Sequence, residues 1–203
     1  MITTKTNCKA CAGNGRVTLC KSGNLCACAV EDMGVVCERG FSATCPDCSG
    51  VVYTQRSNLS KWDRRFVELA EGVAAWSKGP RKRIGSAIVR PDRSIASLGY
   101  NGPPRGFDDA AFLAMSRDEQ HAVVIHAEIN AIEQKHEGED LRGYTLYVSP
   151  LFPCHKCAAR IVEAGIARVV AYCGHISPDW RESAQQAETV LIAAGVSCLF
   201  ITD

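Results

Sequence analysis

The sequence predicts an α/β protein: a three-layer α/β/α sandwich around a five-stranded mixed sheet, preceded by a small cysteine-rich module. Three observations support this. After residue 58, short apolar runs alternate with segments of helical periodicity; two of the runs adjoin across a turn at 91–93; and eight of the twelve cysteines fall within the first 48 of 203 residues. Adjacent strands form an antiparallel hairpin and strands separated by helices are joined by crossovers, so a mixed sheet is expected.

Residues 1–57 are predicted to form the separate module, stabilised by zinc. Cys8 and Cys11 lie in a C-x-x-C-x-G-x-G unit, and Cys45 and Cys48 lie in a shorter copy of it. Clustered cysteines in a reducing compartment indicate metal binding rather than disulfides, and the glycines allow the tight turns that point N–H groups at sulfur. A segment with so few large apolar residues also needs such a staple. We therefore expect one structural Zn²⁺ on these four cysteines, in a unit that resembles the cysteine-rich zinc module of the DnaJ chaperones.

The middle of this module does not follow the repeat, which leaves a further zinc ion open. The cysteines concerned are Cys20, Cys26, Cys28 and Cys37. A partner-binding or nucleic-acid-binding role for the module is an alternative to a purely structural one. However, six Lys/Arg against four acids in residues 1–57 is a weak excess, and no aromatic ladder accompanies it.

Residues 58–203 are predicted to form the α/β domain. Ser60 begins a capping box before a helix that runs to about residue 77, and apolar residues recur along it at helical spacing. These are expected to be core: Trp62, Phe66, Leu69, Val73 and Trp76. The remaining elements follow in the order strands 84–89 and 95–100, a polar loop 102–120, helix 126–136, strand 145–149, helix 154–164, strand 168–173, helix 178–194 and strand 196–201. Gly165 and Gly195 are expected to stop the last two helices.

Four residues in this domain have the spacing of a catalytic metal site. His126 and Glu128 form H-x-E, and Cys154 and Cys157 form P-C-x-x-C with the preceding proline. A catalytic zinc takes three protein ligands and keeps a fourth position for water. His126, Cys154 and Cys157 are the expected ligands, which leaves Glu128 beside the metal to carry protons. The alternative is a closed structural zinc site with Glu128 as an ordinary surface acid.

H-x-E combined with P-C-x-x-C resembles the cytidine/deoxycytidylate deaminase superfamily. The segment HAEINAI (126–132) is most similar to the deoxycytidylate branch, and YNGPPRG (100–106) and SPLFPC (149–154) also resemble it. The resemblance implies a cytidine deaminase-like fold over residues 58–203 and one catalytic Zn²⁺ per chain. It further implies zinc-dependent hydrolysis of deoxycytidine monophosphate (dCMP) to dUMP and ammonia, feeding thymidylate synthesis, with Glu128 as the catalytic acid and base.

The resemblance also implies residues that contact the nucleotide. Asn101 would hold the sugar, although Asn-Gly-Pro-Pro is a turn sequence in any case. Tyr172 is expected to approach the ring or else to pack in the core, and Ala127 is placed among the substrate contacts. Three cations are candidates for the phosphate, or else are solvated surface charges: Lys78, Arg81 and Arg105.

Charge and composition limit the other function classes. The formal net charge is +1, so no strong field for nucleic acid exists, and no apolar run of 18 residues or signal peptide is present. We expect a cytoplasmic protein without membrane contact that binds a small nucleotide and, as the resemblance implies, forms a homo-oligomer, with a hexamer favoured. Two alternatives remain: a deaminase of cytidine, cytosine, modified dCMP or tRNA adenosine, and a nucleic-acid-binding regulator on a deaminase scaffold. An intact Glu128 argues against the regulator.

The resemblance has limits in the regulatory features. Some relatives carry an extra zinc before H-A-E, but residues 102–120 contain no cysteine, so that site is not expected here. Residues 133–137 also lack the pattern associated with nucleotide regulation in the allosteric members. Feedback by dCTP and dTTP is therefore not predicted from the sequence.

Overall fold

The computed structural model describes residues 16–17, 43–44, 51–56, 59–172 and 178–202. Two short strands, β1 (Arg16–Val17) and β2 (Ala43–Thr44), pair in antiparallel fashion. The predicted ligands of the structural zinc, together with the other cysteines of the first 48 residues, lie outside the described residues. The zinc-stabilised module and the boundary at residue 57 therefore stay predictions.

A mixed sheet in the order β3-β8-β7-β6-β4-β5 forms the centre of the molecule. β4 is antiparallel to both neighbours, and β6, β7, β8 and β3 are parallel to one another. All five predicted strands are present, and a sixth, β3, extends the sheet at the β8 edge. The strands are β3 (Val51–Gln55), β4 (Gly85–Val89), β5 (Ile95–Tyr100), β6 (Thr145–Ser149), β7 (Arg168–Tyr172) and β8 (Ser197–Thr202).

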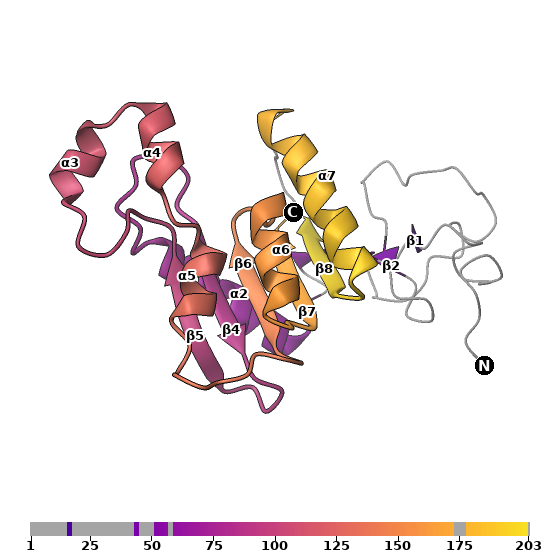
Figure 1. Cartoon of the computed structure of the whole chain (residues 1–203). Coiled ribbons are helices and arrows are strands. Elements are labelled where there is room, and N and C mark those ends of the chain that lie inside the picture. The colour runs from indigo at the N-terminus through magenta and orange to yellow at the C-terminus, as the bar shows by residue number, and fades with distance from the viewer. Residues whose placement is uncertain (1–15, 18–42, 45–50, 57–58, 173–177, 203) are drawn as a thin grey trace.

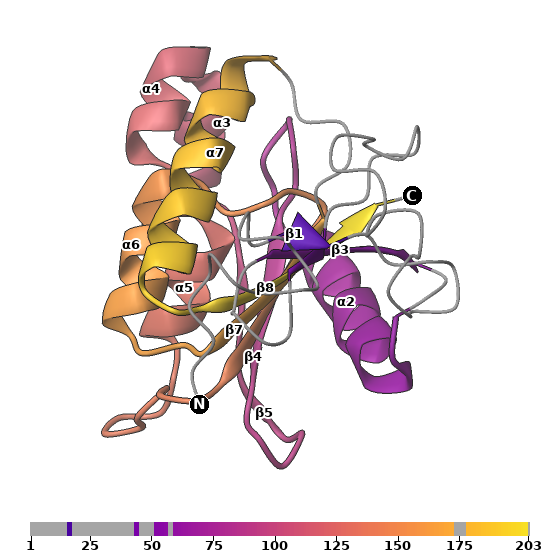
Figure 2. The same ribbon diagram turned by 90° about the vertical axis from the view of Figure 1, so that its right-hand side faces the viewer.

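Helices cover both faces of the sheet, as the predicted sandwich requires. Figure 2 shows the sheet nearly edge-on, with α2 on one side and the remaining helices on the other. The helices packed against the sheet are α2 (Lys61–Ala74), α5 (Ala127–Glu133), α6 (His155–Glu163) and α7 (Pro178–Ala193). Among the described residues, every helix is too short or too polar to cross a membrane.

The predicted polar loop at 102–120 is wrong, because the segment from 109 to 123 contains two short helices. α3 (Asp109–Ala114) and α4 (Arg117–Val123) project beyond the end of the sheet in Figure 1. Side chains of Asp108 and Ser116 cap them, and Ser116 forms a full capping box with Glu119. Helices of six and seven residues are too short for apolar periodicity to reveal them. They nevertheless shape the cavity described below.

Two of the residues predicted to be core in α2 are exposed. Trp62 is 36% and Trp76 57% exposed, whereas Phe66 is buried as expected. The buried apolar residues of α2 are Phe66, Val67, Ala70, Val73 and Ala74, and the helix ends at Ala74 rather than near residue 77, so Trp76 lies beyond it. Trp62 lies between two guanidinium groups, with Arg65 4.9 Å and Arg93 5.0 Å from its ring centroid, which is a favourable place for an exposed indole.

The apolar core has two parts, one on each face of the sheet. The larger lies under α5, α6 and α7 and includes Val169 and Ala171 of β7. The smaller lies under α2 and includes Val170 and Tyr172. Successive residues of a strand point to opposite faces, so β7 supplies both parts in alternation. The larger part supports the helix ends that form the site.

Candidate active site

Three predicted metal ligands converge where α5 and α6 begin. His126 is the N-cap residue of α5 and Cys154 that of α6, with Cys157 in the first turn of α6. The Nδ1 atom of His126 lies 3.5 Å from Cys154 Sγ and 3.2 Å from Cys157 Sγ. Among the described residues this is the one group of His, Cys, Asp and Glu side chains whose ligand atoms meet closely enough for a metal ion.

The donor set and its spacing fit zinc. Two thiolates and one imidazole are ligands found at catalytic zinc sites, where a fourth position stays open. Tetrahedral ligands about 2.0–2.3 Å from zinc lie about 3.3–3.8 Å from one another, close to the observed separations of His126 from the two sulfurs. The side chains therefore stand near coordinating positions.

Cys154 and Cys157 influence each other's ionisation. Hydrogen bonding by the Cys157 side chain, aided by His126 and the Cys157 backbone N–H, lowers the pKa of Cys154. The same interaction, together with burial, raises the pKa of Cys157. A divalent cation bound here would favour the thiolate form of both cysteines.

Glu128, in the first turn of α5, is 4% exposed and lies outside the three-ligand group. Burial raises the pKa of its carboxyl group, while His126 and the residue's own backbone N–H act in the opposite direction. A buried carboxyl with a raised pKa, beside a metal site, can both accept and donate protons.

The site opens into a cavity of about 580 Å³. His126, Ala127 and Glu128 line it, and so do residues of α3 and α4. The other lining residues are Gly79, Pro80, Arg81, Lys82, Ile84, Asn101, Gly102, Phe112, Arg117, Gln120, His121, Val124, Leu151, Phe152 and Trp180. A cavity of this size suits a small organic ligand.

Three of the predicted substrate contacts, Asn101, Arg81 and Ala127, line the cavity. The Asn101 side chain also holds the cavity wall. Its Oδ1 accepts a hydrogen bond from the Ile84 backbone N–H at 2.7 Å, and its Nδ2 donates to the Lys82 carbonyl at 3.0 Å. One of the two N–H bonds of Nδ2 is left over. A turn-stabilising role and a substrate contact are therefore compatible.

The other three predicted contacts lie elsewhere. Lys78 and Arg105 are outside the cavity lining, and Lys78 is paired with Asp109. Tyr172 points toward α2, on the opposite face of the sheet, and its hydroxyl accepts a hydrogen bond from Arg56 Nη1 at 2.8 Å. Since even-numbered residues of β7 face α2, Tyr172 packs in the core under α2 and not beside the ring of the predicted nucleotide.

Sequence reasoning missed other residues of the cavity. Arg117 and His121 stand at i and i+4 on α4, a spacing that places both on one side of the helix. That spacing is readable in the sequence once α4 is recognised. Trp180 of α7 lies with its ring centroid 6.3 Å from that of His126, and its Nε1 is 3.5 Å from the Phe152 carbonyl oxygen. Its place depends on tertiary packing alone.

Residues 60–173 match the sequence profile of the family described as the cytidine and deoxycytidylate deaminase zinc-binding region. An uncharacterized deaminase from the luxG 3′ region of Aliivibrio fischeri is 37% identical over 147 residues, covering 70% of this chain and 95% of that protein. Human deoxycytidylate deaminase is 35% identical over 127 residues, covering 60% and 70%.

The fold is also found in a solved structure. The dCMP deaminase of cyanophage S-TIM5, in its apo form, superposes with a TM-score of 0.53 at 24% identity, covering 70% of this chain and 98% of that one. This likeness concerns the fold and confirms the predicted cytidine deaminase-like sandwich.

Proposed function

Because the chain belongs to the cytidine and deoxycytidylate deaminase family, we propose that it hydrolyses dCMP to dUMP and ammonia. One observation carries this function: a buried glutamate stands beside a His-Cys-Cys ligand set and lines the cavity together with the histidine. The 35% identity to human deoxycytidylate deaminase favours dCMP within the family. The dUMP formed would feed thymidylate synthesis.

His126, Cys154 and Cys157 would hold the catalytic zinc, which, when bound, supplies a water of lowered pKa. Glu128 takes a proton from the water that attacks C4 of the cytosine ring. It gives this proton to N3, then takes the second proton from the hydroxyl group now on C4 and passes it to the departing amino group, so that ammonia leaves and a C4 carbonyl remains. The raised pKa of Glu128 suits transfer in both directions.

The cavity also carries positive charge suited to a 5′-phosphate. Arg81 and Lys82 approach from the segment before β4, and Arg117 and His121 from α4. Arginine binds phosphate through two parallel N–H bonds, so Arg81 and Arg117 are the proposed phosphate ligands. Asn101, with its remaining N–H, is proposed to contact the sugar.

The amino-terminal cysteines support a second proposal, one structural zinc per chain. The paired C-x-x-C units supply four thiolates, Cys8, Cys11, Cys45 and Cys48. Metal analysis of purified protein should then give two zinc ions per chain, and one ion with the catalytic site filled would remove this proposal. A cytoplasmic location and a homo-oligomer, favoured as a hexamer, are proposed from the sequence; sedimentation of the purified protein tests the oligomer.

An ammonia-release panel tests the substrate assignment. We expect kcat/KM for dCMP to exceed that for deoxycytidine by about tenfold to a hundredfold, because a charge-assisted phosphate contact is worth roughly 1.5–3 kcal/mol. Arg117→Ala should remove most of this preference by lowering kcat/KM for dCMP. The matched control is Arg105→Ala, because Arg105 is an exposed arginine outside the cavity lining. This substitution should leave kcat/KM unchanged for both dCMP and deoxycytidine. Equal rates on dCMP and deoxycytidine, or activity only on a tRNA anticodon stem, would refute the dCMP assignment.

A further inference from the structure

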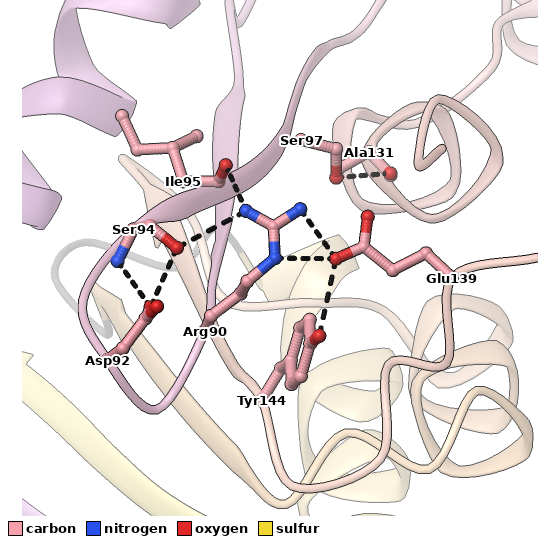
Figure 3. Close-up of polar contacts among 8 residues, drawn as sticks. All are labelled: Arg90, Asp92, Ser94, Ile95, Ser97, Ala131, Glu139 and Tyr144. Atoms are coloured by element: carbon pink, nitrogen blue, oxygen red, sulfur yellow. Dashed lines mark hydrogen bonds and ion pairs between the residues drawn. The ribbon is translucent and has the colours of Figure 1, made fainter. Parts of the chain in front are cut away.

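Two buried serines tie α5 to the sheet. Ser86 of β4 donates a hydrogen bond from Oγ to the Ala127 carbonyl at 2.7 Å. Ser97 of β5 donates in the same way to the Ala131 carbonyl, also at 2.7 Å, as Figure 3 shows. The two acceptors are one helical turn apart. The same chemical contact is thus made twice, once at the start of α5 and once near its end.

The Ser86 contact lies where solvent cannot replace it. Ser86 is fully buried, and Gly99 of β5 lies so close that a Cβ atom there would be 2.2 Å from the Ala127 carbonyl oxygen. The Ser86 hydroxyl has a single proton and a second oxygen, that of Gly99, at 3.4 Å, so the proton goes to the nearer Ala127 carbonyl. Removing this hydroxyl leaves a buried carbonyl without that bond.

The two carbonyls differ in what their peptides carry. The peptide that begins with the Ala127 carbonyl ends with the nitrogen of Glu128, so fixing it fixes the backbone from which the Glu128 side chain starts. The peptide that begins with the Ala131 carbonyl leads to Ile132, one turn away. A small rotation of the first peptide would be carried to the Glu128 carboxylate, and one of the second would not.

The region around Ser97 has additional support. Arg90, which follows β4, bonds through Nε to Glu139 at 2.7 Å and through Nη1 to the Ile95 carbonyl at 2.7 Å (Figure 3). Glu139 also accepts a hydrogen bond from the Tyr144 hydroxyl at 3.2 Å. These contacts join the β4–β5 turn to the segment after α5. The position of the C-terminal end of α5 therefore does not depend on the Ser97 hydrogen bond alone.

We propose that Ser86 is a positioning residue for the reaction: its hydrogen bond to the Ala127 carbonyl holds Glu128 at the angle that proton transfer requires. This rests on the proposed deaminase function. Ser86 is neither among the residues that line the cavity nor part of the His126, Cys154 and Cys157 group. Its effect therefore falls on the chemical step and not on binding, whereas Ser97 contributes to stability alone.

The test compares Ser86→Ala with Ser97→Ala in the full chain. Both should lower Tm by similar amounts, since each removes one buried hydrogen bond of the same length. We expect Ser86→Ala to lower kcat by about tenfold to a hundredfold. Its KM, its affinity for dUMP and its zinc content should stay within about twofold of the wild type. Ser97→Ala should keep kcat within about threefold.

Equal kcat values in the two variants would overturn the proposal, and so would zinc loss or a raised KM in Ser86→Ala. If Ser86→Ala does not fold, Ser86→Cys keeps the size and weakens the donor, and full kcat in that variant would overturn the proposal equally. The backbone ¹⁵N resonance of Glu128 gives a readout independent of substrate, and it should move more in Ser86→Ala than in Ser97→Ala. If the wild type has no activity on dCMP but the Glu128 resonance still moves more in Ser86→Ala than in Ser97→Ala, the dCMP function is refuted. The coupling between the Ser86 hydrogen bond and Glu128 then still holds.

Discussion

The two faces of the sheet bury ionisable groups in opposite ways. Under α2, the Asp63 carboxylate accepts two hydrogen bonds from Arg168, at 2.7 and 3.1 Å, and one from the Tyr147 hydroxyl at 2.9 Å. Burial alone would raise the pKa of Asp63, but Arg168 and the hydroxyl groups of Ser60 and Tyr147 outweigh it and the pKa is lowered. On the other face burial prevails, and the pKa of Glu128 is raised.

This difference in pKa distinguishes Asp63, a buried carboxylate that stabilises the fold, from Glu128, a buried carboxyl suited to proton transfer. A buried carboxylate enclosed by its own cation and hydroxyl groups is held ionised and cannot exchange protons near neutral pH. A buried carboxyl whose partners do not outweigh desolvation, and which faces a cavity, can exchange protons. Asp63 and Glu128 are buried to a similar degree, 7% and 4% exposed, so exposure alone would not distinguish them.

The largest expected effect is loss of a metal ligand on the cavity face. Cys157→Ala should abolish turnover and lower the zinc content by one ion per chain, because two ligands hold zinc far more weakly than three. Cys198→Ala, which removes a buried thiol of β8 outside the ligand group, should keep both. Turnover and zinc content should be measured on the same samples of both variants. Full zinc occupancy in Cys157→Ala would rule out Cys157 as a ligand.

Glu128→Gln should come next. We expect kcat to fall by about 10²- to 10⁴-fold while zinc stays bound, since the amide keeps the shape but cannot carry protons. Glu133→Gln, at the last residue of α5 and exposed, is the control and should match the wild type. Loss of the catalytic zinc in Glu128→Gln would show that this residue is a ligand.

On the α2 face the same kind of change should affect stability and leave catalysis intact. Asp63→Asn should lower the free energy of unfolding by on the order of 2 kcal/mol, because Arg168 loses a charged acceptor. kcat should be unchanged. The control is Asp109→Asn, whose exposed pair with Lys78 should contribute little to stability. Urea unfolding measures the stability of each variant, and turnover assays measure its kcat. A tenfold fall in kcat for Asp63→Asn would show that the α2 face also contributes to catalysis.

The smallest effect is the pH dependence of that stability difference. The pKa of Asp63 is lower in the folded protein than its value of 3.8 in a free chain, so its contribution is fully present above pH 3.8. It is lost as the pH falls through the lower, folded-state pKa. The difference in unfolding free energy between wild type and Asp63→Asn should therefore be constant from neutral pH to about pH 5 and shrink below pH 4. A difference that grows on acidification would contradict the assigned pairing.

The sequence predicted the grouping of His126, Cys154 and Cys157, because each lies at a helix start that the local sequence indicates. His126 and Cys154 each stand at the N-cap of a helix that follows an extended segment, and Cys157 lies one turn on from Cys154. The five strands were also predicted to within about a residue at each end. In both cases, neighbours in the chain decide the outcome.

The cavity was predicted less well because distant segments form it. Arg117 reaches it only because α3 and α4 fold over the start of α5, whereas Lys78 and Arg105 lie outside. The sequence left Tyr172 between the ring and the core because 169–172 is apolar throughout, so no polar residue indicates which face of β7 meets α2. The partner of β3 could not be read either, since the paired residues of β8 lie 147 positions further along the chain.

The pairing of β3 with β8 has a consequence for shortening the chain. A truncated protein that begins at Val51 keeps the outer edge of the sheet covered, and Arg56 keeps its bonds to Tyr172 and Glu71. One that begins at residue 58 exposes the backbone of β8 along an apolar strand, which invites edge-to-edge aggregation. When the two forms are expressed, the one that begins at Val51 should be the more soluble, because residues 51–57 include β3 and cover the edge of β8.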